Sequence, residues 1–260
     1  MTINRGKSDE EIAKRYLQRV ADRKKTANPE MQKIPVEQEE KEQIKPEINI
    51  DIKNPQDYVI VPNTNILIAK KETFKGLNWN DTHFKLAENG LFMPAPKLFT
   101  DYFQSVIRAE QGKEKLYDGA GNLLKSQEVN EIYKYLTTDY NKGCWTWLDA
   151  LFKQESDKWK VISNHKVVNN KLVGQPNDLE KCLMEDCFCD LDFNKQGLAI
   201  SKSKSQSYSQ SNNIYFWHPR NNAVARFNAD SGRAYLYCYG GPDDRDDSLG
   251  VFACAVGAKN

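Results

Sequence analysis

The sequence predicts a single α+β domain preceded by an N-terminal appendage. Three observations support this prediction. Two amphipathic helical patterns occur early in the body of the chain, short alternating strand patterns dominate its second half, and the first 57 residues differ in composition from the rest. The chain has 260 residues, of which 39% are apolar, so it is long enough for one core of roughly 200 residues.

Residues 1–57 predict one helix followed by a flexible linker. Ser8 to Glu11 match a capping box, and apolar residues then recur at helical spacing up to about Lys25. Residues 28–56 are rich in Glu, Lys, Gln and Pro and contain no aromatic residue, which is typical of a solvated linker. A single narrow apolar stripe does not fold alone. This segment is therefore either a tether to a larger assembly or a tail.

The first half of the body predicts two short strands followed by two helices. Pro62-Asn63 is a turn-forming pair between two β-rich runs. Asn80 or Asp81 can cap the first helix, and Asn89-Gly90 ends it. The expected elements are strands at residues 58–61 and 66–69, and helices from about residue 80 to 89 and from 96 to 112.

The second half predicts strands in one irregular antiparallel sheet. Residues 145–152 resemble a strand, and residues 159–162 and 167–173 resemble a hairpin with Asn169-Asn170 as its turn. Residues 178–192 also fit a helix. The segment after Ile214 is short, alternating and turn-rich, as expected for further strands.

Residues 205–258 differ in composition from the rest of the chain. They contain no Lys and no Glu, although the whole chain has 28 Lys and 17 Glu. At uniform usage about six Lys would fall in this segment. Tyr, Asp, Gly, Asn, Ser and Arg take their place. The functional prediction depends on this change.

An alternating pattern inside this segment predicts a binding face. Tyrosines occupy every second position from 235 to 239, so they share one face while Leu236 and Cys238 point the other way. Tyr supplies rigid contact area and Gly, Ser and Asn supply adaptable hydrogen bonds, as in antibody paratopes. The alternative is a cross-strand tyrosine ladder beside an ordinary acidic loop. The predicted contact residues are Asn221, Asn222, Arg226, Asn228, Asp230, Ser231, Gly232, Tyr235, Tyr237, Tyr239, Gly240, Gly241, Asp243, Asp244, Arg245, Asp246 and Asp247.

The predicted contact residues share a property of their codons. Arg, Asn, Asp, Ser, Gly and Tyr can all be reached from an Asn codon by changing only its adenines. Lys, Glu, Gln, Met and Trp cannot be reached in this way, and none of these five occurs between Asn221 and Gly250. This pattern favours the binding face over the tyrosine ladder.

The residues between these positions resemble the variable region of variable proteins from diversity-generating retroelements, most of all the archaeal and nanoarchaeal-type group. From Ala223 the frame reads AVAxFxAxxxRAxLxCxxxP, followed by LGV at 249–251. The constant part of that group is similar to the upstream runs NTNILIAKKETFKGLNWNDTH, GLFMP, WTWLDALF and LEKCLMEDC. The resemblance covers about residues 58–258.

This resemblance implies a fold and a function. Residues 58–260 would form a C-type-lectin-like domain of the formylglycine-generating-enzyme-like branch, with a variable region at about 212–258. A reverse transcriptase acting in trans on the gene would rewrite the variable positions. The product would bind a ligand, foremost a protein surface, without turnover and without a cofactor. The three tyrosines would be the main contacts, and their loss would leave the folded state almost as stable as before.

Two relatives of that fold offer alternative functions. Gln175-Pro176-Asn177 and Trp79-Asn80-Asp81 match the two calcium motifs of sugar-binding C-type lectins, but they occur in reversed order. An oxidase of the formylglycine-generating type needs a reactive cysteine pair, whereas Cys238 and Cys254 fit core positions. The principal alternative is a lectin-like module of fixed sequence that binds carbohydrate or protein.

No catalytic, metal or cofactor site is predicted. The six cysteines lack the paired spacing of a zinc site. The sequence contains no Gly-x-Ser-x-Gly turn whose serine could pair with His83 or His165. His218 fits an aromatic cluster at the rim of the binding face. A net charge of +1 without a basic stripe argues against nucleic acid as a partner. No apolar run spans a membrane and no signal peptide is evident, so the expected location is the cytoplasm or a virus particle.

Overall fold

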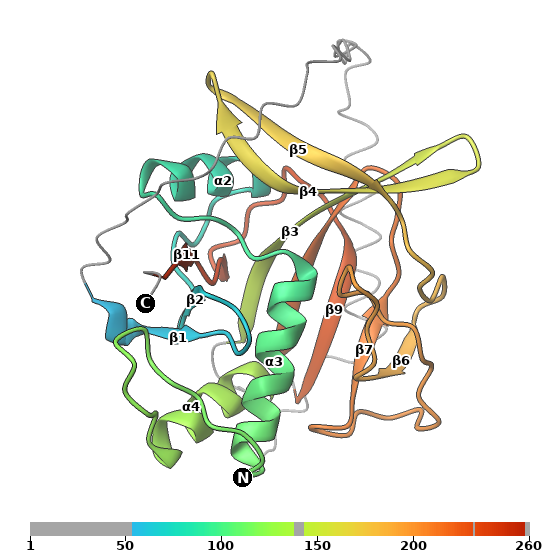
Figure 1. Cartoon of the computed structure of the whole chain (residues 1–260). Coiled ribbons are helices and arrows are strands. Elements are labelled where there is room, and N and C mark those ends of the chain that lie inside the picture. The colour runs from blue at the N-terminus through green and yellow to red at the C-terminus, as the bar shows by residue number, and fades with distance from the viewer. Residues whose placement is uncertain (1–53, 138–142, 231, 258–260) are drawn as a thin grey trace, which may run out of the picture. The chain divides into compact units, whose positions relative to one another are not determined.

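The computed structural model describes residues 54–137, 143–230 and 232–257 (Figure 1). The predicted N-terminal helix, nearly all of the linker and Ser231 lie outside these ranges. The described residues form an α+β fold, as predicted. Its helices are η1 (Pro55–Asp57), α2 (Trp79–Glu88), α3 (Pro96–Glu110) and α4 (Ser126–Thr137). Within the described ranges, no helix combines the length and the apolar character needed to cross a bilayer.

A small sheet joins the beginning and the end of the domain. Its strands are β1 (Tyr58–Ile60), β2 (Ile66–Ala69) and β11 (Cys254–Val256), in the order β1-β2-β11. Both pairings are antiparallel. The turn between β1 and β2 contains Asn63 at a φ of 61°, a conformation that Asn tolerates better than most residues. The predicted turn at Pro62-Asn63 is therefore correct.

A large sheet carries the remaining strands, in the order β5-β4-β3-β8-β9-β7-β6, with β10 beside β3. β9 lies between β8 and β7; it is antiparallel to β8 and parallel to β7. β10 is also parallel to β3. The sheet is thus mixed, and the predicted purely antiparallel sheet is wrong in these two pairs. The strands are β3 (Cys144–Glu155), β4 (Lys158–Val168), β5 (Lys171–Asp178), β6 (Cys187–Asp190), β7 (Asn213–Trp217), β8 (Ala223–Asp230), β9 (Arg233–Gly240) and β10 (Leu249–Gly250).

The helices differ from the prediction in number. α4 was not expected, although Val129, Ile132 and Leu136 are buried along it at helical spacing. Residues 178–192 do not form a helix. β5 extends to Asp178, and β6 pairs with β7 instead, because strand pairing outweighs a weak local helical preference.

The predicted boundaries of α2 and α3 are close to those observed. α2 is capped by Asn78, whose side chain accepts a hydrogen bond from the Asp81 N–H at 2.7 Å, two residues before the expected cap. α3 begins at Pro96 as predicted and ends at Glu110. Both helices therefore form where their local signals place them.

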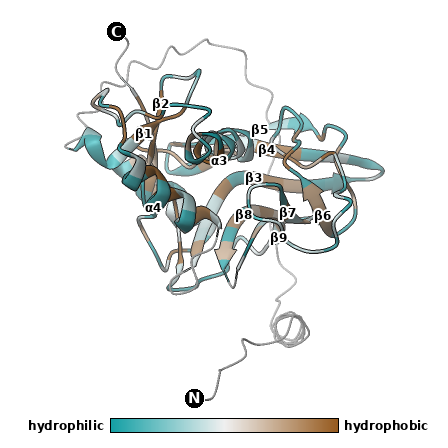
Figure 2. Cartoon of the chain, turned by 90° about the horizontal axis from the view of Figure 1, so that it is seen from below, coloured by the Kyte–Doolittle hydropathy of each residue, from teal (hydrophilic) through white to brown (hydrophobic). Residues whose placement is uncertain are grey.

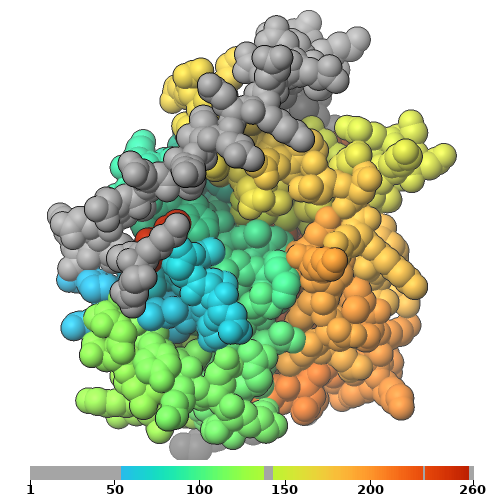
Figure 3. All heavy atoms as spheres, viewed as in Figure 1, coloured from blue at the N-terminus to red at the C-terminus, as the bar shows by residue number. Residues whose placement is uncertain are grey.

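The main core lies between α3 and the large sheet. The Phe227 ring on β8 is 4.8 Å from the ring of Phe99 and 5.1 Å from that of Phe103, measured between centroids. Figure 2 shows α3 on one side of strands β3, β8 and β9. Figures 1 and 3 look onto this helix-covered side, where α3 and α4 contribute much of the surface. The outer face of the sheet points away from that view.

Glu72 links three elements beneath the surface. Its side chain is only 1% exposed. Oε1 accepts a hydrogen bond from the Trp145 N–H of β3 at 2.8 Å, and Oε2 accepts one from the Tyr135 hydroxyl of α4. Lys75 Nζ lies 3.5 Å from Oε2 and supplies a counter-charge. One carboxylate thus ties the segment after β2 to a strand and a helix.

Replacing Glu72 with alanine is expected to lower the free energy of unfolding by about 1–3 kcal/mol, because the part-buried Trp145 N–H and the Tyr135 hydroxyl both lose their acceptor. Glu88→Ala is the matched control, since Glu88 forms only an exposed pair with Lys85 and should change stability by less than about 0.5 kcal/mol. Urea unfolding measures both. Equal losses for the two variants would contradict this role of Glu72.

Candidate ligand-binding face

Two rows of side chains cross the outer face of the large sheet. Residues paired on neighbouring strands point to the same side, and successive residues of one strand alternate. Phe227 and Leu236 point toward α3, so their neighbours point away from it. The first row is Trp145, Asn228, Tyr235, Tyr215 and Phe188; the second is Trp147, Arg226, Tyr237 and Trp217.

Six aromatic residues of these rows and the adjacent Tyr239 form a surface that we call the aromatic face. The six are Trp145, Phe188, Tyr215, Trp217, Tyr235 and Tyr237. Five rings of the aromatic face, those of Phe188, Tyr215, Trp217, Tyr237 and Tyr239, are in contact across β6, β7 and β9. Tyr237 and Tyr239 stack with centroids 4.0 Å apart, and Trp217 lies 5.9 and 5.4 Å from them. Tyr215 lies 5.0 Å from Trp217. These contacts give the face a rigid aromatic surface.

Arg226 lies among the rings of the aromatic face. Its guanidinium carbon is 4.0 Å from the Tyr237 ring centroid and 5.7 Å from that of Trp145. Both distances lie within the range of cation–π attraction. Trp145 Nε1 also donates a hydrogen bond to Asp230 Oδ2 at 3.0 Å. A positive and a negative group therefore flank the same indole.

Two buried polar atoms of β8 lack a hydrogen-bond partner among the described residues. They are Arg226 Nε and Asn228 Oδ1. Leaving such an atom unsatisfied costs about 1–3 kcal/mol, so a purely structural sheet would favour apolar residues at these positions.

Tyr235 remains a hydrogen-bond donor over a wide pH range. Burial raises the pKa of its phenol, and the neighbouring Asp230 carboxylate raises it further. Tyr235 also pairs with Asn228 across β8 and with Tyr215 across β7. Tyr235 is therefore the central residue of the first row, and its hydroxyl stays protonated.

The predicted contact residues differ in how far solvent reaches them. Tyr237 is 5% exposed because Arg226 and its aromatic neighbours cover it, and Asn228 is 1% exposed. Gly240 is also buried, with Trp147 and Val224 against it. These three residues are covered by their neighbours in the described structure, so they present little surface of their own. Half-buried positions are Arg226, Asp230, Gly232, Tyr235, Tyr239, Gly241, Asp244 and Asp246, and exposed positions are Asn221, Asn222, Asp243, Arg245 and Asp247.

The acidic loop, residues 241–248, follows β9 and contacts α2. Pro242 O accepts a hydrogen bond from the Trp79 N–H at 3.0 Å, and Arg245 pairs with Asp81. Within the loop, Asp244 Oδ2 accepts a hydrogen bond from the Gly241 N–H at 3.2 Å. The loop is thus an ordered extension of the aromatic face.

Several residues of the face were missed from the sequence. Tyr215-Phe216-Trp217 alternates like residues 235–239, so this signal was present, but the strand precedes residues 221–250, to which the codon pattern is confined. Trp145 belongs to β3, far away in the sequence. The structure brings these aromatic residues beside the three predicted tyrosines through the pairings of β7 and β3.

A charged cluster lies at the rim of the face. Asp186 Oδ1 accepts a hydrogen bond from the His218 N–H at 3.0 Å and lies 2.6 Å from His218 Nδ1. Arg220 donates to Asp186 Oδ2 at 3.0 Å, and its guanidinium lies 5.8 Å from the Tyr239 ring. His218 therefore lies near the rim, held by Asp186, and none of these three residues is a predicted variable position.

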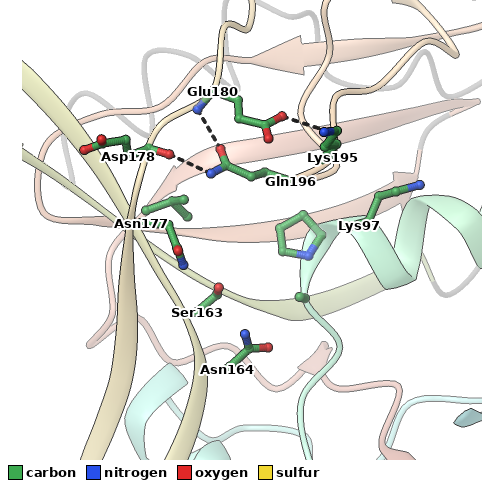
Figure 4. Close-up of a pocket in the computed structure, with 11 residues that line it drawn as sticks. Lys97, Ser163, Asn164, Asn177, Asp178, Glu180, Lys195 and Gln196 are labelled. Carbon is green, nitrogen blue, oxygen red and sulfur yellow. Dashed lines mark hydrogen bonds between the residues drawn. The ribbon is translucent and has the colours of Figure 1, made fainter. Parts of the chain in front are cut away.

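A separate hollow of about 470 Å³ lies between the start of α3 and the β4–β5 hairpin (Figure 4). Its polar groups largely bond to one another. Gln196 Nε2 donates to Asp178 O at 2.8 Å, and Gln196 Oε1 accepts from the Glu180 N–H at 2.9 Å. Asn177 of the Gln-Pro-Asn run lines it, but no predicted contact residue does.

Three kinds of comparison relate the whole chain to known proteins. Comparisons with family models, curated proteins and solved structures found no match. The arrangement of the aromatic face, its rim and the acidic loop offers stacking surfaces, carboxylates, phenol hydroxyls and the guanidinium groups of Arg220, Arg226 and Arg245. These groups suit non-covalent recognition of a polar and apolar surface.

Tyr237→Ala and Tyr239→Ala are expected to have different effects on stability. Tyr237 is nearly fully buried, so its removal should cost about 3 kcal/mol, whereas removal of the half-buried Tyr239 should cost about 1 kcal/mol. Urea unfolding of the two single variants measures the difference. Near-zero losses for both would support the expectation from sequence that all three tyrosines are dispensable for folding.

Proposed function

We propose that the protein binds a ligand, foremost a protein surface, through the aromatic face and the acidic loop, and that a diversity-generating retroelement diversifies these positions. One observation carries this proposal. The diversified positions of β8 and β9 alternate with Phe227, Ala229, Leu236 and Cys238, each of which is at most 1% exposed. Phe227, Ala229, Leu236 and Cys238 therefore face the helix-covered side of the sheet, and the half-buried Arg226, Asp230, Tyr235 and Tyr239 face the other side, together with the covered Asn228 and Tyr237.

This partition is what a diversified binding protein requires. A change at Arg226 or Tyr239 alters the outer face, while the core contacts of Phe227 with α3 are untouched. Trp217 and Arg220 lie outside the diversified pattern and supply a constant part of the surface. Aromatic and arginine side chains of this kind dominate binding energy at protein interfaces.

The fold and the gene arrangement belong to the same proposal. A C-type-lectin-like fold is compatible with the observed α+β class and with the irregular sheet, whose register shifts in three strand pairs. The reverse transcriptase would act in trans on the gene. The protein would function in the cytoplasm or on a virus particle, as a binding protein rather than an enzyme.

The DNA that flanks the gene provides the first test. We expect a second, near-identical copy of the segment encoding about residues 212–258, close to a reverse transcriptase gene. The two copies should differ almost only where the second copy has adenine. Differences spread over frame positions such as Phe227 and Leu236 would contradict diversification.

Tolerance to substitution provides a second test. A library randomised at Arg226, Tyr239, Asp243 and Arg245 should yield mostly folded, soluble variants. A control library randomised with the same codons at Phe227, Leu236, Cys238 and Val251 should yield few, because removing buried apolar side chains costs about 2–5 kcal/mol each. A fluorescent fusion or proteolysis screen compares the two fractions. Equal fractions would show that the outer face is not separable from the core.

The alternative is a lectin-like module of fixed sequence. The hollow beside Asn177 favours it, since amide and hydroxyl groups that line a hollow suit a sugar. Against it, Asp81 of the second calcium motif is paired with Arg245. Calcium-dependent binding to a glycan panel, lost in Asn177→Ala, would support this alternative.

A further inference from the structure

A compact cluster of two imidazoles and one carboxylate lies away from the aromatic face. It consists of His83 on α2, Asp149 on β3 and His165 on β4. One nitrogen or oxygen of each lies within 4.8 Å of the others. In the described ranges, no other set of three His, Cys, Asp or Glu side chains comes together in this way.

Both strands that carry the cluster are irregular at these residues. The pairing of β3 with β8 shifts between Trp147 and Leu151, on either side of Asp149. The pairing of β4 with β5 shifts between Ser163 and Lys166, on either side of His165. Such irregularities re-aim side chains and are enriched at functional sites. Here both turn a polar side chain toward α2.

The cluster is buried, and its hydrogen bonding is incomplete. Asp149 is 3% exposed; its Oδ2 accepts from the His165 N–H at 3.0 Å, and its Oδ1 lies 2.5 Å from His165 Nδ1. His83 is 4% exposed, and its Nε2 lies 3.6 Å from Asp149 Oδ1. That nitrogen has no hydrogen-bond partner in the described part of the chain. A buried carboxylate needs a positive partner, and a buried ring nitrogen needs a bond.

The surroundings hold both rings in place. The Trp79 indole meets His83 and His165 edge-on, with centroids 4.4 and 4.9 Å away. A Cβ at Gly174 of β5 would lie 2.3 Å from His165 Nε2, so only glycine leaves room for this ring.

We propose that His83 Nε2, Asp149 Oδ1 and His165 Nδ1 bind one divalent transition-metal ion, with Zn²⁺ the ion best matched to them. Two imidazoles and a carboxylate form a zinc donor set, whereas Ca²⁺ and Mg²⁺ prefer oxygen ligands alone. A bound Zn²⁺ ion would accept the lone pair of His83 Nε2 and would offset the negative charge of the Asp149 carboxylate.

The observed spacing needs a small adjustment to accept the ion. Zinc ligands lie about 2.0–2.2 Å from the metal, so ligand atoms in a tetrahedral site are about 3.3 Å apart. The separation of 3.6 Å between His83 Nε2 and Asp149 Oδ1 fits this requirement. The contact of 2.5 Å between His165 Nδ1 and Asp149 Oδ1 must open, and a proton on that nitrogen passes to solvent as the metal–nitrogen bond forms.

The ion would join α2 to the large sheet. α2 also holds the acidic loop, through the Trp79 N–H and Asp81. Metal bound only by the folded state stabilises that state. The ion would therefore stabilise the element on which the loop rests, while it stays apart from the aromatic face.

Zinc reconstitution of the full chain tests the proposal. After chelator treatment and addition of Zn²⁺, desalted wild-type protein is expected to retain one zinc per chain and to melt at a higher temperature. His83→Gln and His165→Gln should each weaken zinc affinity at least about tenfold and abolish the thermal shift. His218→Gln is the matched control, because His218 also lies against an aspartate but has no second histidine beside it. Wild-type protein without retained zinc, or full retention in His83→Gln, would overturn the proposal.

Cobalt titration keeps the test decisive if the glutamine variants do not fold. Wild-type protein with Co²⁺ should show the visible bands of tetrahedral coordination, without the charge-transfer absorption of bound thiolate. This second feature excludes binding by the six cysteines. A spectrum identical to that of free aqueous Co²⁺, or one dominated by thiolate charge transfer, would overturn the assignment.

Discussion

The packing of Phe227 against Phe99 and Phe103 determines which side of the β8–β9 ribbon faces outward. Side chains alternate along a strand, so a shift of one residue would exchange the two faces completely. This core contact fixes the register of β8 against β9. Asn228 therefore pairs with Tyr235 and Arg226 pairs with Tyr237, and these pairs belong to the two rows on the outer face of the sheet. The position of the aromatic face is therefore a consequence of core packing and not of the outer residues themselves.

The acidic loop has a different support. Gly240 approaches Trp147, and the loop then meets the first turn of α2 at Trp79 and Asp81. The indole of Trp79 donates to Leu148 O and stands beside the histidine cluster. A single helix thus connects the loop to the interior of the sheet, so changes in loop sequence and changes near His83 act on the same element.

Local signals explain which parts of this protein the sequence predicts. The hairpin turn at Asn169-Asn170 is correct because both residues adopt positive φ values of 49° and 59°, which asparagine favours. The alternation at residues 235–239 predicts Leu236 and Cys238 as core. By contrast, the parallel pairing of β7 with β9 and the approach of Trp145 to Asp230 depend on long-range pairing. No local pattern encodes them, and the same holds for the meeting of His83, Asp149 and His165.

The interior position of β8 and β9 has a consequence for self-association. Each has a strand on both sides in the described sheet, so their backbone hydrogen-bonding groups are used within the molecule. The described edges are β5 and β6, which carry none of the positions that would vary. Unpaired strand edges are the usual templates for fibre-like growth between molecules. Substitutions on this face would therefore create no new strand edge through which copies of the chain could polymerise.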